Sequence, residues 1–76
     1  MNDSQKMFYD FYMKLIKPGV EKKAEAILAE NFRKQDEGSF DKQYLENVIP
    51  VMLELVREEE VEHLKQVMQR FAKEQR

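Results

Sequence analysis

Two short stretches interrupt a sequence that otherwise has the periodicity of α-helices. They are "KPG" at residues 17–19 and "QDEGSFD" at residues 35–41. Proline disfavours helical geometry at the preceding residue, and glycine readily takes the left-handed conformation that follows many helices. We therefore predict a first helix that ends at about Lys17, a second helix through "VEKKAEAILAENFRKQ", and further helix from Asp41 onward.

Capping residues support these boundaries. Asn2, Asp3 or Ser4 suits the start of the first helix, because a short polar side chain accepts hydrogen bonds from the first-turn N–H groups. Ser39 or Asp41 suits the next start, and Gly38 suits the left-handed position just before it. Pro18 is compatible with the first turn of the second helix.

The sequence after Asp41 contains two possible interruptions. Pro50 kinks a helix or begins one, and we favour a kink because a common apolar face crosses it. At about 100° per residue, that face and the face from Val61 to Phe71 differ by roughly a quarter turn. The acidic run "REEE", from Arg57 to Glu60, lies at this offset and favours a new helix near Glu58. A single bent helix from Asp41 to about Gln75 is the alternative.

The composition favours a small all-α protein. Residues 1–76 are expected to form a single helical domain, a bundle of three to four helices that is kinked or broken around Pro50 and the "REEE" run. The chain has no cysteine, so packing alone must stabilise a length near the lower limit for independent folding. Dimerisation would therefore complete the bundle. We expect a cytoplasmic protein, because no secretory signal or bilayer-spanning apolar run is found.

The first helix carries more apolar surface than one stripe can use. The segment "MFYDFYM" has six apolar or aromatic residues in seven positions. Met7, Phe8, Phe11, Tyr12 and Leu15 form one stripe, and Tyr9, Met13 and Ile16 widen it to about two thirds of the circumference.

Two explanations fit this surface. Either the helix is central within its own bundle, or it meets another chain. We predict partner contact, most simply in a symmetric homodimer. The predicted contact residues are Tyr9, Tyr12, Met13, Ile16 and Met52.

Chemistry-bearing residues are few. Glu60 and His63 have the Glu-x-x-His spacing of di-iron carboxylate bundles, but such a site needs two of these pairs and two further glutamates. We therefore predict no metal site, no cofactor and no enzyme activity, and keep Glu60 with His63 as a weak metal alternative. An acidic first turn followed by a solvated histidine explains the same residues.

Basic residues suggest one alternative function. Lys14, Lys17, Lys22 and Lys23 flank the turn at Pro18, as a basic helix–turn–helix face would. Interleaved glutamates and a net charge of −2, which arises entirely after Ser39, argue against phosphate binding. The sequence therefore predicts a non-catalytic protein-interaction or regulatory module, with a small nucleic-acid-associated regulator as the alternative.

Overall fold

Both predicted interruptions are turns between helices. The computed structural model describes the backbone of residues 1–74 and the side chains of residues 1–70. In chain order the elements are α1 (Asp3–Leu15), α2 (Glu21–Glu37), α3 (Lys42–Glu54), a 3₁₀ turn (Glu58–Glu60) and α4 (Val61–Glu74). The predicted all-α class is confirmed, with four helices in the described part of the chain. None of these helices is long and apolar enough to cross a bilayer.

Three helix ends follow the predicted capping chemistry. Asn2 caps α1 in a reciprocal box, in which its Oδ1 accepts from the Gln5 N–H at 2.8 Å and its own N–H donates to Gln5 Oε1 at 3.0 Å. Gly38 ends α2 with a φ of 77°, where a side chain would be strained. Asp41 caps α3 by accepting from the Tyr44 N–H at 2.8 Å.

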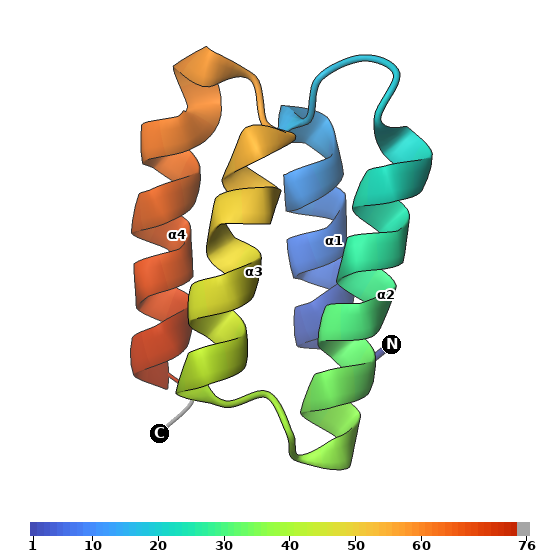
Figure 1. Ribbon diagram of the computed structural model, residues 1–76, viewed down its shortest axis with the longest axis vertical. Helices are drawn as coiled ribbons and strands as arrows, with labels where there is room; N and C mark the ends of the chain where they lie inside the picture. Colours follow the sequence, from blue (N-terminus) through green and yellow to red (C-terminus); the bar gives the residue numbers. More distant parts are fainter. Residues whose placement is uncertain (75–76) are drawn as a thin grey trace.

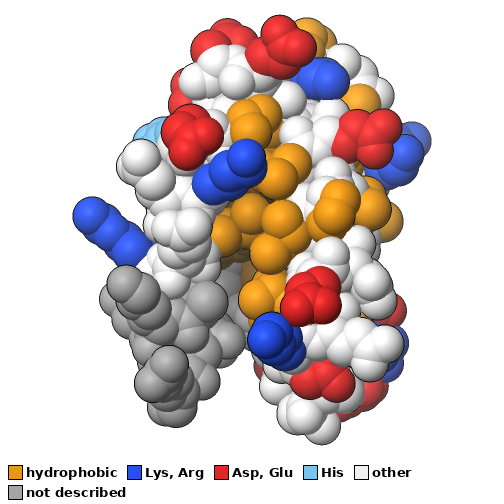
Figure 2. Space-filling model, turned by 60° about the vertical axis from the view of Figure 1, so that its left-hand side comes forward, with side chains coloured by type: hydrophobic (Ala, Val, Ile, Leu, Met, Phe, Trp, Pro, Cys, Tyr) orange, Lys and Arg blue, Asp and Glu red, His pale blue; other side chains and the backbone are white. Residues whose placement is uncertain are grey.

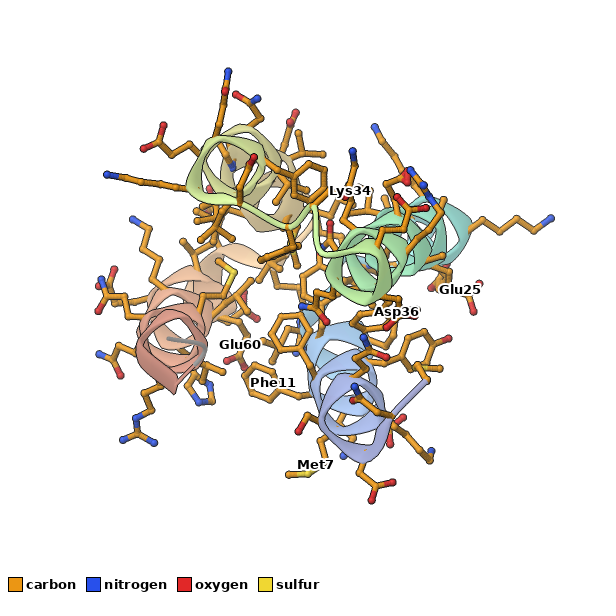
Figure 3. The ribbon with its side chains drawn as sticks, turned by 90° about the horizontal axis from the view of Figure 1, so that it is seen from below. Met7, Phe11, Glu25, Lys34, Asp36 and Glu60 are labelled. Carbon is orange, nitrogen blue, oxygen red and sulfur yellow. The ribbon has the colours of Figure 1, made fainter. Side chains whose placement is uncertain are left out.

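The helices form an antiparallel bundle. Successive helices run in opposite directions, and the view along the bundle places them in a ring in the order α1, α2, α3 and α4 (Figures 1 and 3). The turn at residues 16–20 and the turn after α3 therefore lie at one end of the bundle. The turn at residues 38–41 lies at the other end.

A backbone bridge joins the two turns at the first end. Ile16 and Val56 pair in antiparallel fashion, with the Lys17 N–H donating to the Leu55 carbonyl at 2.8 Å and the Arg57 N–H to the Leu15 carbonyl at 3.0 Å. This pairing needs extended backbone at Ile16, whose ψ is 158°. It explains why α1 ends at Leu15 rather than near Lys17. Pro18 lies in the turn, and α2 begins only at Glu21.

The side chain of Arg57 also stabilises this end of the bundle. Its Nη2 donates to the Lys14 carbonyl at 2.9 Å, and its Nε donates to the Leu15 carbonyl at 3.3 Å. These carbonyls belong to the last turn of α1, which has no helical donors for them and carries partial negative charge. Arg57 thus caps α1 from a segment that is remote in the sequence.

Helical structure in the second half of the chain is interrupted where the "REEE" run predicts. α3 continues through Pro50 and ends at Glu54, and the 3₁₀ turn over Glu58–Glu60 leads into α4. The alternative of a single bent helix is therefore wrong. Pro50 is tolerated because it lies on the exposed side of α3, where the carbonyl that loses its helical donor belongs to exposed Glu46. The predicted helix end near Gln75 and the placement of Phe71 on the apolar face lie outside the described residues.

The core lies between all four helices. Its buried apolar residues are Tyr12, Leu15, Ile16, Ala24, Leu28, Phe32, Met52, Leu55, Val56 and Leu64. Tyr12 is completely buried, and its hydroxyl donates to the Met52 carbonyl at 2.8 Å. Met52 lies near the end of α3, where the Val56 N–H bonds instead to the Leu53 carbonyl. Tyr12 therefore supplies a donor that the helix lacks.

Candidate functional site

The apolar surface of α1 is used within the bundle. α1 packs against α2, contacts α4 through Phe11 and reaches α3 across the core through Tyr12. Three of the five residues predicted to contact a partner lie in this chain's own core: Tyr12, Ile16 and Met52 are 0%, 8% and 2% exposed. A helix with neighbours on three sides needs a wide apolar face, and this geometry favours the central-helix explanation for Tyr12 and Ile16. Met52 belongs to α3 and lies in the same core.

Two of the predicted contact residues keep part of their surface outside. Tyr9 and Met13 are half-buried, and the Tyr9 hydroxyl donates to Glu25 Oε2 at 2.7 Å. This hydrogen bond to a carboxylate raises the pKa of Tyr9. Met7, predicted to share the stripe of Phe11, is instead 70% exposed and points away from the bundle (Figure 3). Because the buried stripe of α1 is centred on Tyr12, Met7 faces outward.

A line of partly exposed apolar side chains lies between α3 and α4. We call it the α3–α4 furrow and define it by Leu45, Ile49, Leu53, Val61 and Met68. At about 100° per residue, the first three share the flank of α3 that faces α4, and the last two share the flank of α4 that faces α3. Figure 2 shows apolar side chains along this furrow. It is the widest apolar surface visible in that view.

Charged residues of both signs border the furrow. Lys42 and Glu46 on α3 and Lys65 and Glu62 on α4 are all exposed. By helical position, Lys42, Glu46 and Lys65 flank the apolar residues directly, and Glu62 lies farther out. The three nearest charges are therefore two basic and one acidic, and the four border residues together are neutral.

A cavity of about 410 Å³ opens near the end of the bundle that carries the α2–α3 turn. Its apolar walls come from all four helices and the turn: Phe8, Phe32, Phe40, Leu45, Val48, Met52 and Met68. The polar residues along it are Asn2, Ser4, Gln5, Asn31, Gln35, Asp41 and Lys42. Apolar walls with a few convergent polar groups are typical of small-molecule sites.

Two amides beside this cavity are deeply buried. Gln5 is 5% exposed, and its Nε2 donates to Gln35 Oε1 at 2.9 Å and to Asp36 Oδ1 at 3.4 Å. Asn31 is also 5% exposed, and its Oδ1 accepts from the Tyr44 hydroxyl at 2.6 Å. Burial raises the pKa of Tyr44.

The amide nitrogen of Asn31 is less well satisfied than its oxygen. Nδ2 carries two N–H donors, and its contact in the structure is the sulfur of Met52 at 3.4 Å. A thioether is a weak acceptor. Asn31 is therefore a buried side chain on the cavity wall with hydrogen-bonding capacity to spare.

Glu60 and His63 lie together at the α1–α4 contact. His63 Nδ1 is 3.5 Å from Glu60 Oε1, and the imidazole meets the Phe11 ring edge-on with the ring centroids 5.3 Å apart. Within the described part of the chain, no group of three or more His, Asp or Glu side chains is placed to hold a metal ion. The contacts of His63 describe a partly exposed residue that packs α4 against α1.

The four lysines of the nucleic-acid alternative are all exposed. Lys14 lies in the last turn of α1 and Lys17 in the turn after it, while Lys22 and Lys23 lie in the first turn of α2, at the bundle end where the two turns pair. Glu21 lies among them and accepts from the Gly19 N–H at 3.4 Å. Nucleic-acid binding by these lysines stays a prediction.

Sequence reasoning missed the cavity and its amides. One signal was present, because Asn31 occupies the same helical stripe as Ala24, Ile27, Leu28 and Phe32. An amide on an apolar stripe is expected to be buried and hydrogen-bonded. The position of Gln5, also on the buried face of α1, carries the same signal.

Comparisons with protein-family models, with curated proteins and with solved structures found no match. The function of this chain is therefore argued from the furrow and the cavity themselves.

Proposed function

We propose that the protein is a non-catalytic interaction module that acts as a homodimer, with the α3–α4 furrow as its contact surface. The observation that carries this proposal is the line of partly exposed apolar side chains between the two helices (Figure 2). Contiguous apolar surface with a polar border is typical of protein contact sites. This surface takes the place of the predicted one on α1, of which only Tyr9 and Met13 keep exposed area.

A second copy of the chain is the occupant that the surface fits best. The border residues Lys42, Glu46, Glu62 and Lys65 are two basic and two acidic, so a two-fold symmetric contact places no net charge against itself. A strongly charged partner would gain little from this border. A chain of 76 residues also gains much from extra burial, because its own core is small.

The oligomeric state of matched variants tests this proposal. Ile49 is partly exposed in the furrow, whereas Val51 is 37% exposed on the opposite flank of the same helix. Ile49→Glu places an unpaired carboxylate in the contact and should convert the dimer to monomer while far-ultraviolet circular dichroism stays unchanged. Val51→Glu introduces the same charge outside the furrow and should leave the dimer intact.

Sedimentation equilibrium distinguishes the possible surfaces. Met13→Glu alters the predicted surface on α1 and is expected to remain dimeric. A wild-type protein that is monomeric at high micromolar concentration would refute the proposal. Dissociation by Met13→Glu but not by Ile49→Glu would place the contact on α1 instead.

A further inference from the structure

We propose that the cavity near the α2–α3 turn binds a small, uncharged, largely apolar molecule that carries one hydrogen-bond acceptor, and that the Asn31 amide donates to this acceptor. A monomeric chain would keep this cavity, which shares Leu45 and Met68 with the α3–α4 furrow and Lys42 with its border, so the binding test below applies whether or not the chain forms a dimer. It rests on the size of the cavity, on the chemistry of its walls and on the geometry of one buried amide.

The size of the cavity fits a compact organic molecule. Its volume of about 410 Å³ lies within the range of small-molecule sites and is between two and three times the roughly 150 Å³ of an engineered protein cavity that holds benzene. Phe8 and Phe32 supply aromatic wall surface from α1 and α2, and Met52 and Met68 supply adaptable thioether surface from α3 and α4. A ligand with two fused aromatic rings matches this space.

The charges along the cavity favour a neutral ligand. Asp41 is engaged in capping α3, where its Oδ1 accepts from the Tyr44 N–H at 2.8 Å. Lys42, next to it, is exposed to solvent and carries the opposite charge. An ionised ligand would lose hydration on entering apolar walls and would find no net opposite charge there.

Asn31 supplies the directional contact. The residue is only 5% exposed and it lines the cavity. Its amide oxygen already accepts a hydrogen bond from the Tyr44 hydroxyl. The amide nitrogen faces the Met52 sulfur at 3.4 Å, a contact far weaker than a bond to oxygen. A carbonyl oxygen on the ligand would give this buried donor a strong acceptor, and a buried donor gains most from such a partner.

Three naphthalenes of nearly equal shape test the inference. 2-Acetonaphthone carries a carbonyl, 2-ethylnaphthalene replaces that carbonyl with a methylene, and 2-naphthoate carries a charge. Equilibrium dialysis with the full chain should give saturable binding of the ketone, about threefold to tenfold weaker binding of the hydrocarbon, and the weakest binding of the carboxylate. Absence of saturable ketone binding, or equal affinity for ketone and hydrocarbon, would refute the inference.

A pair of variants isolates the amide. Tyr44→Phe removes the hydroxyl that Asn31 accepts from, and should keep the preference for the ketone. Adding Asn31→Leu to that variant should abolish the preference while hydrocarbon binding remains. A preference that survives Asn31→Leu would show that another group contacts the carbonyl.

A second pair locates the site. Val48→Phe adds bulk to the cavity wall and should weaken the binding of the ketone and of the hydrocarbon more than tenfold. Val51→Phe adds the same bulk on the exposed flank of α3 and should leave both affinities unchanged. In the wild type, the side-chain amide resonances of Asn31 should move further downfield with the ketone than with the hydrocarbon, because a hydrogen bond adds to the ring-current shift that both ligands cause. This measurement does not depend on the folding of any variant, and equal shifts at saturation with the two ligands would contradict the proposed contact.

Discussion

Replacing Tyr12 with phenylalanine tests the contact that joins α1 to α3 across the core. The hydroxyl of this fully buried side chain donates to the Met52 carbonyl at 2.8 Å. Tyr12→Phe keeps the ring and leaves that carbonyl without this donor in the interior. Loss of a buried hydrogen-bond partner costs about 1–3 kcal/mol, and a loss near 2 kcal/mol would lower the Tm of a domain of this size by roughly 10 °C.

The same variant has a second signature at alkaline pH. Burial raises the pKa of Tyr12 from 10.0 to about 12, so the folded protein holds the hydroxyl neutral where the unfolded chain ionises it. The stability linked to this group is fully present below about pH 10 and is lost as the pH rises toward 12. A shift of two pKa units corresponds to about 2.7 kcal/mol, and Tyr12→Phe lacks this pH-dependent loss.

Urea unfolding at neutral pH and at several alkaline pH values measures both effects. The free energy of unfolding of Tyr12→Phe should lie below that of the wild type at neutral pH, and the gap should close as the pH approaches 12. Tyr9→Phe is the matched control, since the Tyr9 hydroxyl bonds to Glu25 at the surface and its loss should leave stability unchanged. A neutral-pH loss below about 0.5 kcal/mol, or a gap that does not change with pH, would refute the reasoning.

Four further predictions follow from local geometry and from the sequence alternatives. Gly38→Ala should lower the free energy of unfolding by about 1 kcal/mol in urea titrations, because the φ of 77° is strained for alanine although no atom lies within 4 Å of the added carbon. Arg57→Met keeps the aliphatic stem but loses the bonds to the last carbonyls of α1, and should cost about 1 kcal/mol; an unchanged Tm would show that this cap contributes nothing. Duplex DNA at low salt should show no binding by fluorescence anisotropy. Binding that disappears when the four exposed lysines Lys14, Lys17, Lys22 and Lys23 are replaced by alanine would support the nucleic-acid alternative. Dialysis against iron, manganese or zinc should leave no stoichiometric metal on the protein, and bound metal that is lost on His63→Ala would overturn that expectation.

Three helix ends could be predicted from the sequence because the groups that set them are local. The N-caps at Asn2 and Asp41 act on N–H groups three residues ahead, and Gly38 ends α2 through its own backbone conformation. The break at the "REEE" run was likewise visible as a shift in the helical stripe. These features need no knowledge of neighbouring helices.

The packing of whole helices determined the features that could not be predicted from the sequence. The two-residue error at the end of α1 arises because Ile16 pairs with Val56, which is forty residues later in the chain. The wide apolar surface of α1 fits either a partner or three neighbouring helices, and only the bundle shows that Tyr12 and Ile16 face the latter. The buried amide of Asn31 gains its significance in the same way, because the cavity beside it forms only where four helices meet. Local hydrogen bonds and backbone conformation fix the starts of α1 and α3 and the end of α2, whereas the end of α1 and the burial of side chains depend on which surfaces distant segments bring together.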